Sequence, residues 1–372
     1  MQDVSRRTFL EKLGLGVGLS TAAFALPSFL SNAAKKPPIA EGDKLNVALV
    51  GLGNYSNILA RALETSQYCR LAGIVTGTPA KAEDWSKKYN IPKKNIYNYQ
   101  NFDTIKDNKD IDLVYVVLPN SMHAEFTIRA ARAGKHVICE KPMAVSVQEC
   151  EEMIKACKDA GVQLAIGYRL HYEPFNLEIK RLGQEKVFGP VRFIEAANGF
   201  RAGNANMWRL KKELSGGGPL MDMGVYCLQA TRYVLGEEPI SVTAQFGPVT
   251  RKELFSEVEE SVLWQLEFPG GAIASSFTSY NTNVGRFYAA AEKGFFELNP
   301  AYGYGPLKGR TSNGELNLPI VNHQTAQMDG IGKVLLDKQA LPDHISGAEG
   351  LRDVRIMLAI YEAARTGKKI AL

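Results

Sequence analysis

The sequence predicts two parts: a doubly wound parallel α/β sheet, followed by an α+β domain built on a large, mostly antiparallel open sheet. Three observations predict this fold class. Short apolar runs alternate with helical segments over residues 45–166, and strands with turn residues replace that rhythm over residues 167–372. A length of 372 residues also favours two domains over one small core.

The first part contains fully apolar runs, which predict strands buried on both faces of a parallel sheet. These strands are expected at residues 46–50, 71–75, 113–118, 136–139 and 163–166. Helices are expected between them, at residues 55–63, after Pro79, at 121–133, and from the capping box of Ser146 and Glu149 to Gly161.

The second part contains alternating patterns joined by turn dipeptides, Gly270-Gly271 and Lys293-Gly294, which indicate an antiparallel meander. A helix at about 176–182 precedes the strands, and a helix at 348–365 with Gly367 as its cap follows them. The strands are expected at residues 191–196, 241–245, 261–268, 272–279, 286–291 and 295–298.

The composition is that of an ordinary globular protein, with 45% hydrophobic and 22% charged residues. A formal charge of +5 over this length is too dilute for a nucleic-acid-binding surface, so no nucleic-acid partner is expected. The five cysteines are odd in number and have no CxxC spacing. We therefore expect buried free thiols and no metal site.

The first 34 residues have the order of an export signal. Arg6 and Arg7 precede a Gly-rich apolar run at residues 13–30 and then small residues, which indicates the twin-arginine route and a periplasmic location. Cleavage is expected near Ala33 or Ala34. The alternative is a membrane anchor, but glycines and a proline weaken the run as a spanning helix, so no stable membrane insertion is expected.

Residues 35–44 contain Pro37 and Pro38 and read as a linker or an N-terminal arm. The alternative is a remnant of signal processing with no structural role.

A glycine-rich turn follows the first predicted strand and opens the first helix. Its sequence from Gly51 to Ser56 is Gly-Leu-Gly-Asn-Tyr-Ser, with Ser56 at the third glycine position of a dinucleotide fingerprint. This context predicts a Rossmann domain with a nicotinamide dinucleotide whose pyrophosphate lies at the helix N-terminus. The alternative is a glycine-rich turn without a ligand.

The end of the second strand indicates which dinucleotide is bound. An NAD enzyme usually has a carboxylate there for the ribose hydroxyls, but this chain has Thr76, Gly77 and Thr78, and then Lys81. Hydroxyls and an ammonium suit a 2′-phosphate, so we expect NADP rather than NAD.

Lys141 lies in the segment Cys-Glu-Lys-Pro at residues 139–142, where a parallel strand leaves the sheet and ligands of such folds bind. An ammonium there can stabilise a developing alkoxide. The alternative is a surface lysine that pairs with Glu140.

Asp222 and Tyr226 follow Gly-Gly-Gly-Pro at residues 216–219 and are four residues apart, on one face of a predicted helix. A carboxylate and a phenol beside Lys141 form a proton-handling set for alcohol oxidation. As isolated residues they would instead be a helix N-terminal acid and a half-buried aromatic.

These segments resemble the Gfo/Idh/MocA oxidoreductase family, and specifically its exported glucose-fructose oxidoreductase branch. The resemblance runs from about Leu45 to the C-terminus. Its motifs are Val-Gly-Leu-Gly-Asn-Tyr at 50–55, Leu-Pro-Asn-Ser-Met-His-Ala-Glu-Phe at 118–126, Gly-Lys-His-Val-Ile-Cys-Glu-Lys-Pro-Met at 134–143, Gly-Tyr-Arg at 167–169, Trp-Arg-Leu-Lys-Lys-Glu-Leu at 208–214, Gly-Gly-Gly-Pro-Leu-Met-Asp-Met-Gly-Val-Tyr at 216–226 and Ala-Ile-Tyr-Glu-Ala-Ala-Arg-Thr-Gly at 359–367.

The resemblance implies a tightly held NADP(H) that is recycled in place, so that one sugar is oxidised at C1 to a lactone and a second is reduced. It implies Lys141, Asp222 and Tyr226 as the catalytic group, and the tyrosine, where the wider family has histidine, favours this branch. It also implies an arm that reaches a neighbouring subunit of a homodimer or homotetramer. The implied cofactor contacts are Gly51, Gly53, Asn54, Tyr55, Thr76, Lys81, Tyr99, Leu118, Pro119, Asn120, His123, Glu140, Lys141, Arg169, Trp208 and Arg209.

The chain departs from that branch in a few positions. Asn54 replaces a lysine, Thr76 a serine and Cys227 a glycine, and the segment between Arg201 and Met207 is shorter. These departures touch the cofactor phosphate and the substrate mouth, so the identity of the sugar stays open.

Two other functions are compatible with the same residues. An NAD(P)-dependent glycoside hydrolase of this superfamily would oxidise its sugar only transiently. A non-catalytic NADP-binding sensor would bind the dinucleotide without reacting, since a Rossmann domain can bind without catalysis.

Overall fold

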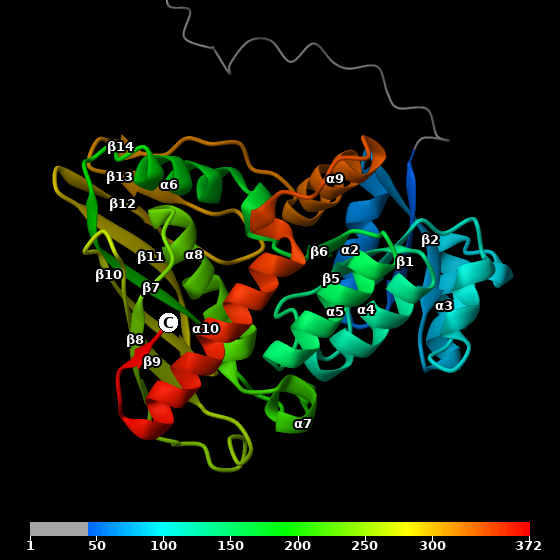
Figure 1. Cartoon of the computed structure of the whole chain (residues 1–372), viewed down its shortest axis with the longest axis horizontal. Helices are drawn as coiled ribbons and strands as arrows, with labels where there is room; N and C mark the ends of the chain where they lie inside the picture. Colours follow the sequence, from blue (N-terminus) through cyan, green and yellow to red (C-terminus); the bar gives the residue numbers. More distant parts are fainter. Residues whose placement is uncertain (1–43) are drawn as a thin grey trace, which may run out of the picture. The chain divides into compact units, whose positions relative to one another are not determined.

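The computed structural model describes residues 44–372, and the export signal and almost all of the predicted arm lie outside this range. Two sheets organise the described part (Figure 1). The predicted fold class is confirmed: one sheet is parallel, with six strands, and the other is mostly antiparallel, with nine.

The first sheet has the strand order β3-β2-β1-β4-β5-β6, and all its pairs are parallel. The order reverses between β1 and β4, which is where open α/β sheets bind ligands at their carboxyl edge. The five predicted strands are present, and β3 is an additional one. The bounds are β1 Leu45–Val50, β2 Cys69–Val75, β3 Ile96–Tyr97, β4 Leu113–Val116, β5 His136–Cys139 and β6 Leu164–Ile166.

Helices cover both faces of this sheet, as its apolar strands require. One face packs on α2, α3 and α9, and the other on α4 and α5. The bounds are α2 Asn54–Thr65, α3 Pro79–Tyr89, α4 His123–Arg132, α5 Val147–Asp159 and α9 His323–Leu336. The Ser146 hydroxyl caps α5 by accepting from Glu149 N, and the Glu149 carboxylate accepts from Val145 N.

Helix α9 was not predicted, and it packs on the first sheet although it comes from the second part of the chain. Two glycines, Gly330 and Gly332, lower the helix propensity of this segment. Gly332 is needed for close packing, because a Cβ atom there would lie 2.7 Å from Cys69 Sγ and 2.9 Å from Tyr68 Cβ.

The second sheet has the order β14-β13-β12-β11-β7-β10-β9-β8-β15. The expected simple meander is wrong in one respect. Strand β7, the first in the chain, lies in the middle, parallel to β10 and antiparallel to β11. The bounds are β7 Val191–Arg201, β8 Ser241–Phe246, β9 Ser261–Glu267, β10 Ile273–Ser279, β11 Asn281–Ala291, β12 Gly294–Leu298, β13 Gly309–Thr311, β14 Gly314–Glu315 and β15 Ile370–Ala371.

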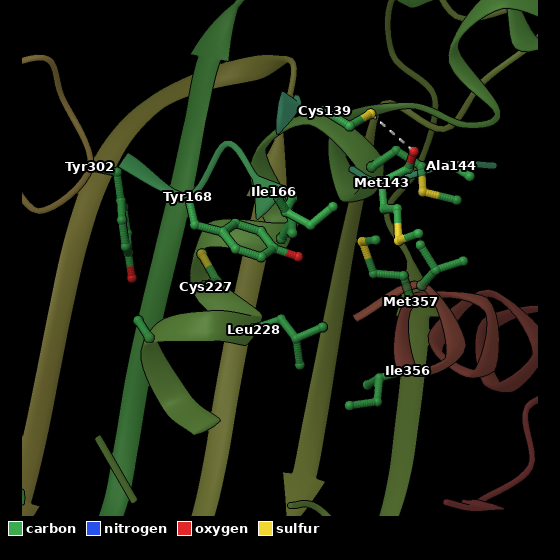
Figure 2. Packing of buried hydrophobic residues seen from close by; sticks show 14 of the residues in the cluster. Cys139, Met143, Ala144, Ile166, Tyr168, Cys227, Leu228, Tyr302, Ile356 and Met357 are labelled. Atoms are coloured by element: carbon green, nitrogen blue, oxygen red, sulfur yellow. Dashed lines mark hydrogen bonds between the residues drawn. The ribbon is translucent and has the colours of Figure 1, made fainter. Parts of the chain in front are cut away.

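One face of the second sheet is covered by helices, and its core is continuous with that of the first sheet. The helices on this side are α6 (Pro174–Gln184), α8 (Val225–Leu235) and α10 (Gly347–Thr366), and short α7 (Lys212–Ser215) precedes α8. Figure 2 shows where the two cores meet. Side chains that follow β5 and β6 lie there beside those of α8 and α10.

All five cysteines are buried and free. No helix in the described part of the chain is long and apolar enough to cross a membrane. Among residues 44–372, no group of three His, Cys, Asp or Glu side chains could hold a metal ion, and the expectation of a metal-free protein stays a prediction.

We predict that Gly332→Val lowers the free energy of unfolding by about 1–2 kcal/mol, because overpacking outweighs the gain in helix propensity. Urea denaturation followed by circular dichroism measures this. The control is Gly285→Ala in β11, where an added Cβ has nothing within 4 Å, and which should shift stability by less than about 0.5 kcal/mol. Equal effects of the two variants would contradict the close-packing role of Gly332.

Candidate functional site

The glycine-rich turn after β1 leaves its backbone open. Gly51 has φ +92°, and a Cβ there would lie 2.6 Å from Val117 O, so only glycine fits. Gly53 faces open space, and the Ser56 hydroxyl donates to Gly51 O at 2.5 Å. Helix α2 begins here with no side-chain cap and no acidic residue in its first turn. Its free N–H groups and positive helix end fit the pyrophosphate of a dinucleotide.

Beside this turn, the segment after β2 carries threonine hydroxyls, and α3 contributes an ammonium. The buried Thr76 hydroxyl accepts from Thr78 N at 3.2 Å. Lys81, on α3, donates from Nζ to Leu52 O at 3.2 Å, so its charge lies at the glycine-rich turn. The Tyr99 ring packs against the backbone at residue 77, where an added Cβ would lie 2.9 Å from it.

Lys141 is the centre of the predicted catalytic group, and it is not a surface lysine. Only 11% of its side chain is exposed, and Nζ donates to Asp222 O at 2.6 Å and to Asp222 Oδ1 at 3.3 Å. The same Nζ lies 4.7 Å from the centroid of the Tyr226 ring. The structure therefore brings Lys141, Asp222 and Tyr226 together, with Asp222 in a π-helical turn, Leu220–Gly224, rather than in a regular α-helix.

Asp222 is surrounded by donors. Besides Lys141, Arg209 Nε donates to its Oδ2 at 2.8 Å and the Tyr280 hydroxyl at 3.0 Å. Burial alone would raise the pKa of Asp222, but the Arg209 and Lys141 charges outweigh burial and lower it to about 2. Asp222 is thus a fixed carboxylate at neutral pH and cannot be the proton acceptor.

Arg169 is 3% exposed and places a second cation against Tyr226. Its Cζ lies 5.1 Å from the Tyr226 ring centroid. Its Nη atoms donate to Tyr302 O at 2.5 Å and to Gly303 O at 2.9 Å, and Nη1 is 2.9 Å from His323 Nδ1. Burial and the Arg169 charge lower the pKa of His323 to about 4, so neutral His323 accepts this hydrogen bond.

The Glu140 carboxyl binds a buried tyrosine hydroxyl. Its Oε1 accepts from the Tyr115 hydroxyl at 2.5 Å, and Gln327 Nε2 donates to that hydroxyl at 2.7 Å. A Cβ at Gly167 would lie 2.5 Å from Glu140 Oε1, which explains the glycine of the Gly-Tyr-Arg motif. Burial raises the pKa of Glu140 to about 7.

Two of the implied cofactor residues have side chains that bind backbone carbonyls. His123 is buried, with its ring nitrogens 2.8 Å from Pro142 O and 2.9 Å from Leu118 O. Asn120 Nδ2 donates to Ser215 O at 2.8 Å. These side chains brace the turns around Lys141, and their predicted contacts with the cofactor stay predictions.

The substrate side of the site combines residues that the sequence suggested with others that it did not. Trp208 and Arg209 lie on one short turn, with Arg209 Cζ 4.5 Å from the Trp208 ring centroid. Arg209 binds Asp222, and the implied cofactor contacts of these two residues stay predictions. Tyr280 and Tyr304 were missed. Tyr280 lies between β10 and β11, Tyr304 lies in the loop between β12 and β13, and no local motif marks either residue.

The fold and this site define the class: a dinucleotide-dependent oxidoreductase whose second sheet closes the site. The chain belongs to the Gfo/Idh/MocA oxidoreductase family. Residues 45–168 match the family described as "Oxidoreductase family, NAD-binding Rossmann fold", and residues 176–297 match the "GFO/IDH/MocA C-terminal domain".

Two curated relatives and one solved structure extend over nearly the whole chain. Aldose-aldose oxidoreductase from Caulobacter crescentus is 41% identical with a TM-score of 0.86, over 88% of this chain and 100% of that chain. A D-xylose 1-dehydrogenase [NADP(+)] from Haloarcula marismortui is 28% identical over 90% of this chain and 94% of its own length. A D-glucoside 3-dehydrogenase from Escherichia coli is 28% identical over 88% of this chain and 97% of its own.

Because the neutral Glu140 carboxyl is favoured in the folded state, its contribution to stability is present at low pH and is lost as pH rises from about 4.5 towards 7. Glu140→Gln removes this titration. We take the difference in the free energy of unfolding, variant minus natural protein. This difference should be about 2 kcal/mol more positive at pH 8 than at pH 5.

Urea unfolding of both proteins at the two pH values measures this difference, and the pH-independent cost of the substitution cancels. Glu125→Gln on the surface of α4 is the control and should show no such difference. A constant gap between the natural protein and Glu140→Gln at both pH values would contradict the raised pKa.

Proposed function

We propose that this protein is an NADP(H)-dependent sugar oxidoreductase similar in activity to glucose-fructose oxidoreductase. It oxidises an aldose at C1 to a lactone and passes the hydride to a second sugar while the cofactor stays bound. The observation that carries this proposal is the buried Lys141, held by Asp222 against the Tyr226 ring at the carboxyl edge of a dinucleotide-binding sheet. The names of the aldose-aldose oxidoreductase and the D-xylose 1-dehydrogenase support an aldose substrate.

The open backbone of Gly51 and Gly53 and the free first turn of α2 fit the pyrophosphate, and Thr76, Thr78 and Lys81 fit a 2′-phosphate. A nicotinamide held there supplies the hydride acceptor and donor. The NADP name of the xylose dehydrogenase supports NADP over NAD.

Tyr226 accepts the hydroxyl proton of the sugar at its phenolic oxygen. Lys141 and Arg169, which both lie against its ring, stabilise the phenolate, and Lys141 also stabilises the developing oxyanion of the sugar. In the second half-reaction Tyr226 returns the proton to the sugar being reduced.

Asp222 orients the sugar. A carboxylate has about four lone-pair sites, and Lys141, Arg209 and Tyr280 fill three of them. Among residues 44–372, Oδ1 accepts only from Lys141, so it keeps a site for a sugar hydroxyl. Because its pKa is about 2, Asp222 acts as an acceptor of hydrogen bonds and not as a base.

The relative named D-glucoside 3-dehydrogenase favours a second candidate, oxidation at C3 instead of C1. The product distinguishes oxidation at C1 from oxidation at C3. C1 oxidation yields a lactone that hydrolyses to an acid, whereas C3 oxidation yields a neutral keto sugar.

We also propose periplasmic export by the twin-arginine route and assembly as a homodimer or homotetramer. The paired Arg6 and Arg7 support export. Exposed apolar side chains on the helix-free face of the second sheet, such as Phe193, Ile273 and Leu263, support assembly through this face.

Lys141→Met should lower turnover by about 10³-fold, because the oxyanion and the phenolate lose their ammonium, while the purified variant still contains cofactor. Near-ultraviolet absorbance of the bound reduced nicotinamide after addition of an aldose panel measures this. Lys87→Met, at an exposed position on α3, is the control and should leave turnover unchanged. The proposal fails if the natural protein reduces no bound nucleotide with any aldose.

Thr76→Asp should weaken NADP binding about tenfold or more and spare NAD, because a carboxylate repels a 2′-phosphate but accepts from a ribose hydroxyl. Calorimetry on protein stripped of cofactor measures both affinities. Thr243→Asp, an exposed position on β8, makes the same charge change outside the site and serves as the control. An equal loss of affinity for NADP and for NAD would argue against a 2′-phosphate site here.

A further inference from the structure

Tyr304 stands out among the aromatic residues around the site because it is 59% exposed. Its neighbours Tyr280 and Tyr302 are buried, at 0% and 5% exposure. It lies in the loop between β12 and β13, where neither strand pairing nor core packing accounts for an aromatic side chain.

The backbone of this loop is held in place by a buried arginine. The buried Arg169 donates to Tyr302 O and Gly303 O, so a charged side chain is dedicated to fixing the two residues before Tyr304. Gly305 follows directly and packs over His323, whose Nε2 would lie 3.6 Å from an added Cβ. Tyr304 is therefore presented on a fixed backbone.

The Tyr304 ring has neighbours both beside the catalytic group and on the cofactor side of the site. Arg169 Cζ lies 4.6 Å from its centroid and 5.1 Å from that of Tyr226, so one guanidinium contacts both rings. On the cofactor side, the ring stacks on Tyr55 with centroids 6.1 Å apart. Partial burial and Tyr226 raise the pKa of Tyr304 to about 12, against the opposing charges of Arg169 and Lys141, so its hydroxyl stays a neutral donor.

We propose that Tyr304 contacts the sugar and selects among sugars. A tyrosine ring offers an apolar face to the C–H side of a pyranose and a hydroxyl to its polar rim, and such amphipathic rings are typical of ligand sites. This inference rests on the proposed function, because it takes a sugar as the ligand. Tyr304 acts on binding, whereas Lys141 and Tyr226 act on the proton and the oxyanion.

Tyr304→Ala should raise KM for the preferred aldose about tenfold and change kcat by less than about threefold, with cofactor content unchanged. Tyr304→Phe keeps the ring and should restore most of the affinity. The matched control is Tyr68→Ala, since Tyr68 lies at the amino end of β2, away from the carboxyl edge. Its KM should equal that of the natural protein.

A second measurement separates this inference from the proposed function. In a Lys141→Met background, which does not turn over, calorimetry should show sugar affinity falling about tenfold on adding Tyr304→Ala. If the natural protein binds sugar through Tyr304 but oxidises none, the inference stands and the proposed function fails.

Two results would overturn the inference while the activity remains. One is a KM that does not respond to Tyr304→Ala. The other is loss of cofactor from that variant with an unchanged KM, which would place the ring on the dinucleotide. Absence of both sugar binding and turnover in the natural protein would overturn both proposals.

Discussion

The buried ion pair between Lys141 and Asp222 is the contact on which the site depends. Lys141 follows β5 of the parallel sheet and Asp222 precedes α8 of the second, so the pair forms only when the two sheets are docked. Burying two charges costs free energy unless their remaining hydrogen-bonding sites are filled. Arg209 and Tyr280 fill two of those of Asp222, and the continuous apolar core holds the two sheets together.

The π-helical turn Leu220–Gly224 places both Asp222 and Tyr226, at the start of α8, beside Lys141. The sequence interpretation placed Asp222 and Tyr226 on one face of an α-helix because they are four residues apart. The wider turn instead directs the Asp222 backbone carbonyl and carboxylate to one ammonium, and Tyr226 lies in the first turn of the regular helix that follows. Such turns interrupt helices frequently at functional sites, and here the interruption creates the bidentate contact with Lys141.

Local patterns predicted the parallel sheet, the glycine-rich turn and Lys141, because each depends on residues adjacent in the chain. Helix α9 was missed because Gly332 serves a close contact with Cys69, which a propensity argument cannot see. The middle position of β7 and the roles of Tyr280 and Tyr304 were missed for a related reason. The positions of β7 and Tyr280 depend on strand pairing across distant segments, and that of Tyr304 depends on the contacts of its loop with Arg169. A single sequence carries no local signal for either.

Tyr226 is the base of the proposed reaction, and the charges around it are mainly positive. Lys141, Arg169 and Arg209 are three cations, whereas only Asp222 is a firm anion, since burial raises the pKa of Glu140 to about 7. Near neutral pH the site therefore has an excess of positive charge. A tyrosine accepts a proton only as its phenolate, and two of these cations lie against the Tyr226 ring, where they would stabilise that negative charge before the proton arrives. The same excess of positive charge would favour a neutral reduced nicotinamide over its oxidised cation, so in the proposed reaction the surroundings of the base also favour hydride transfer out of the sugar.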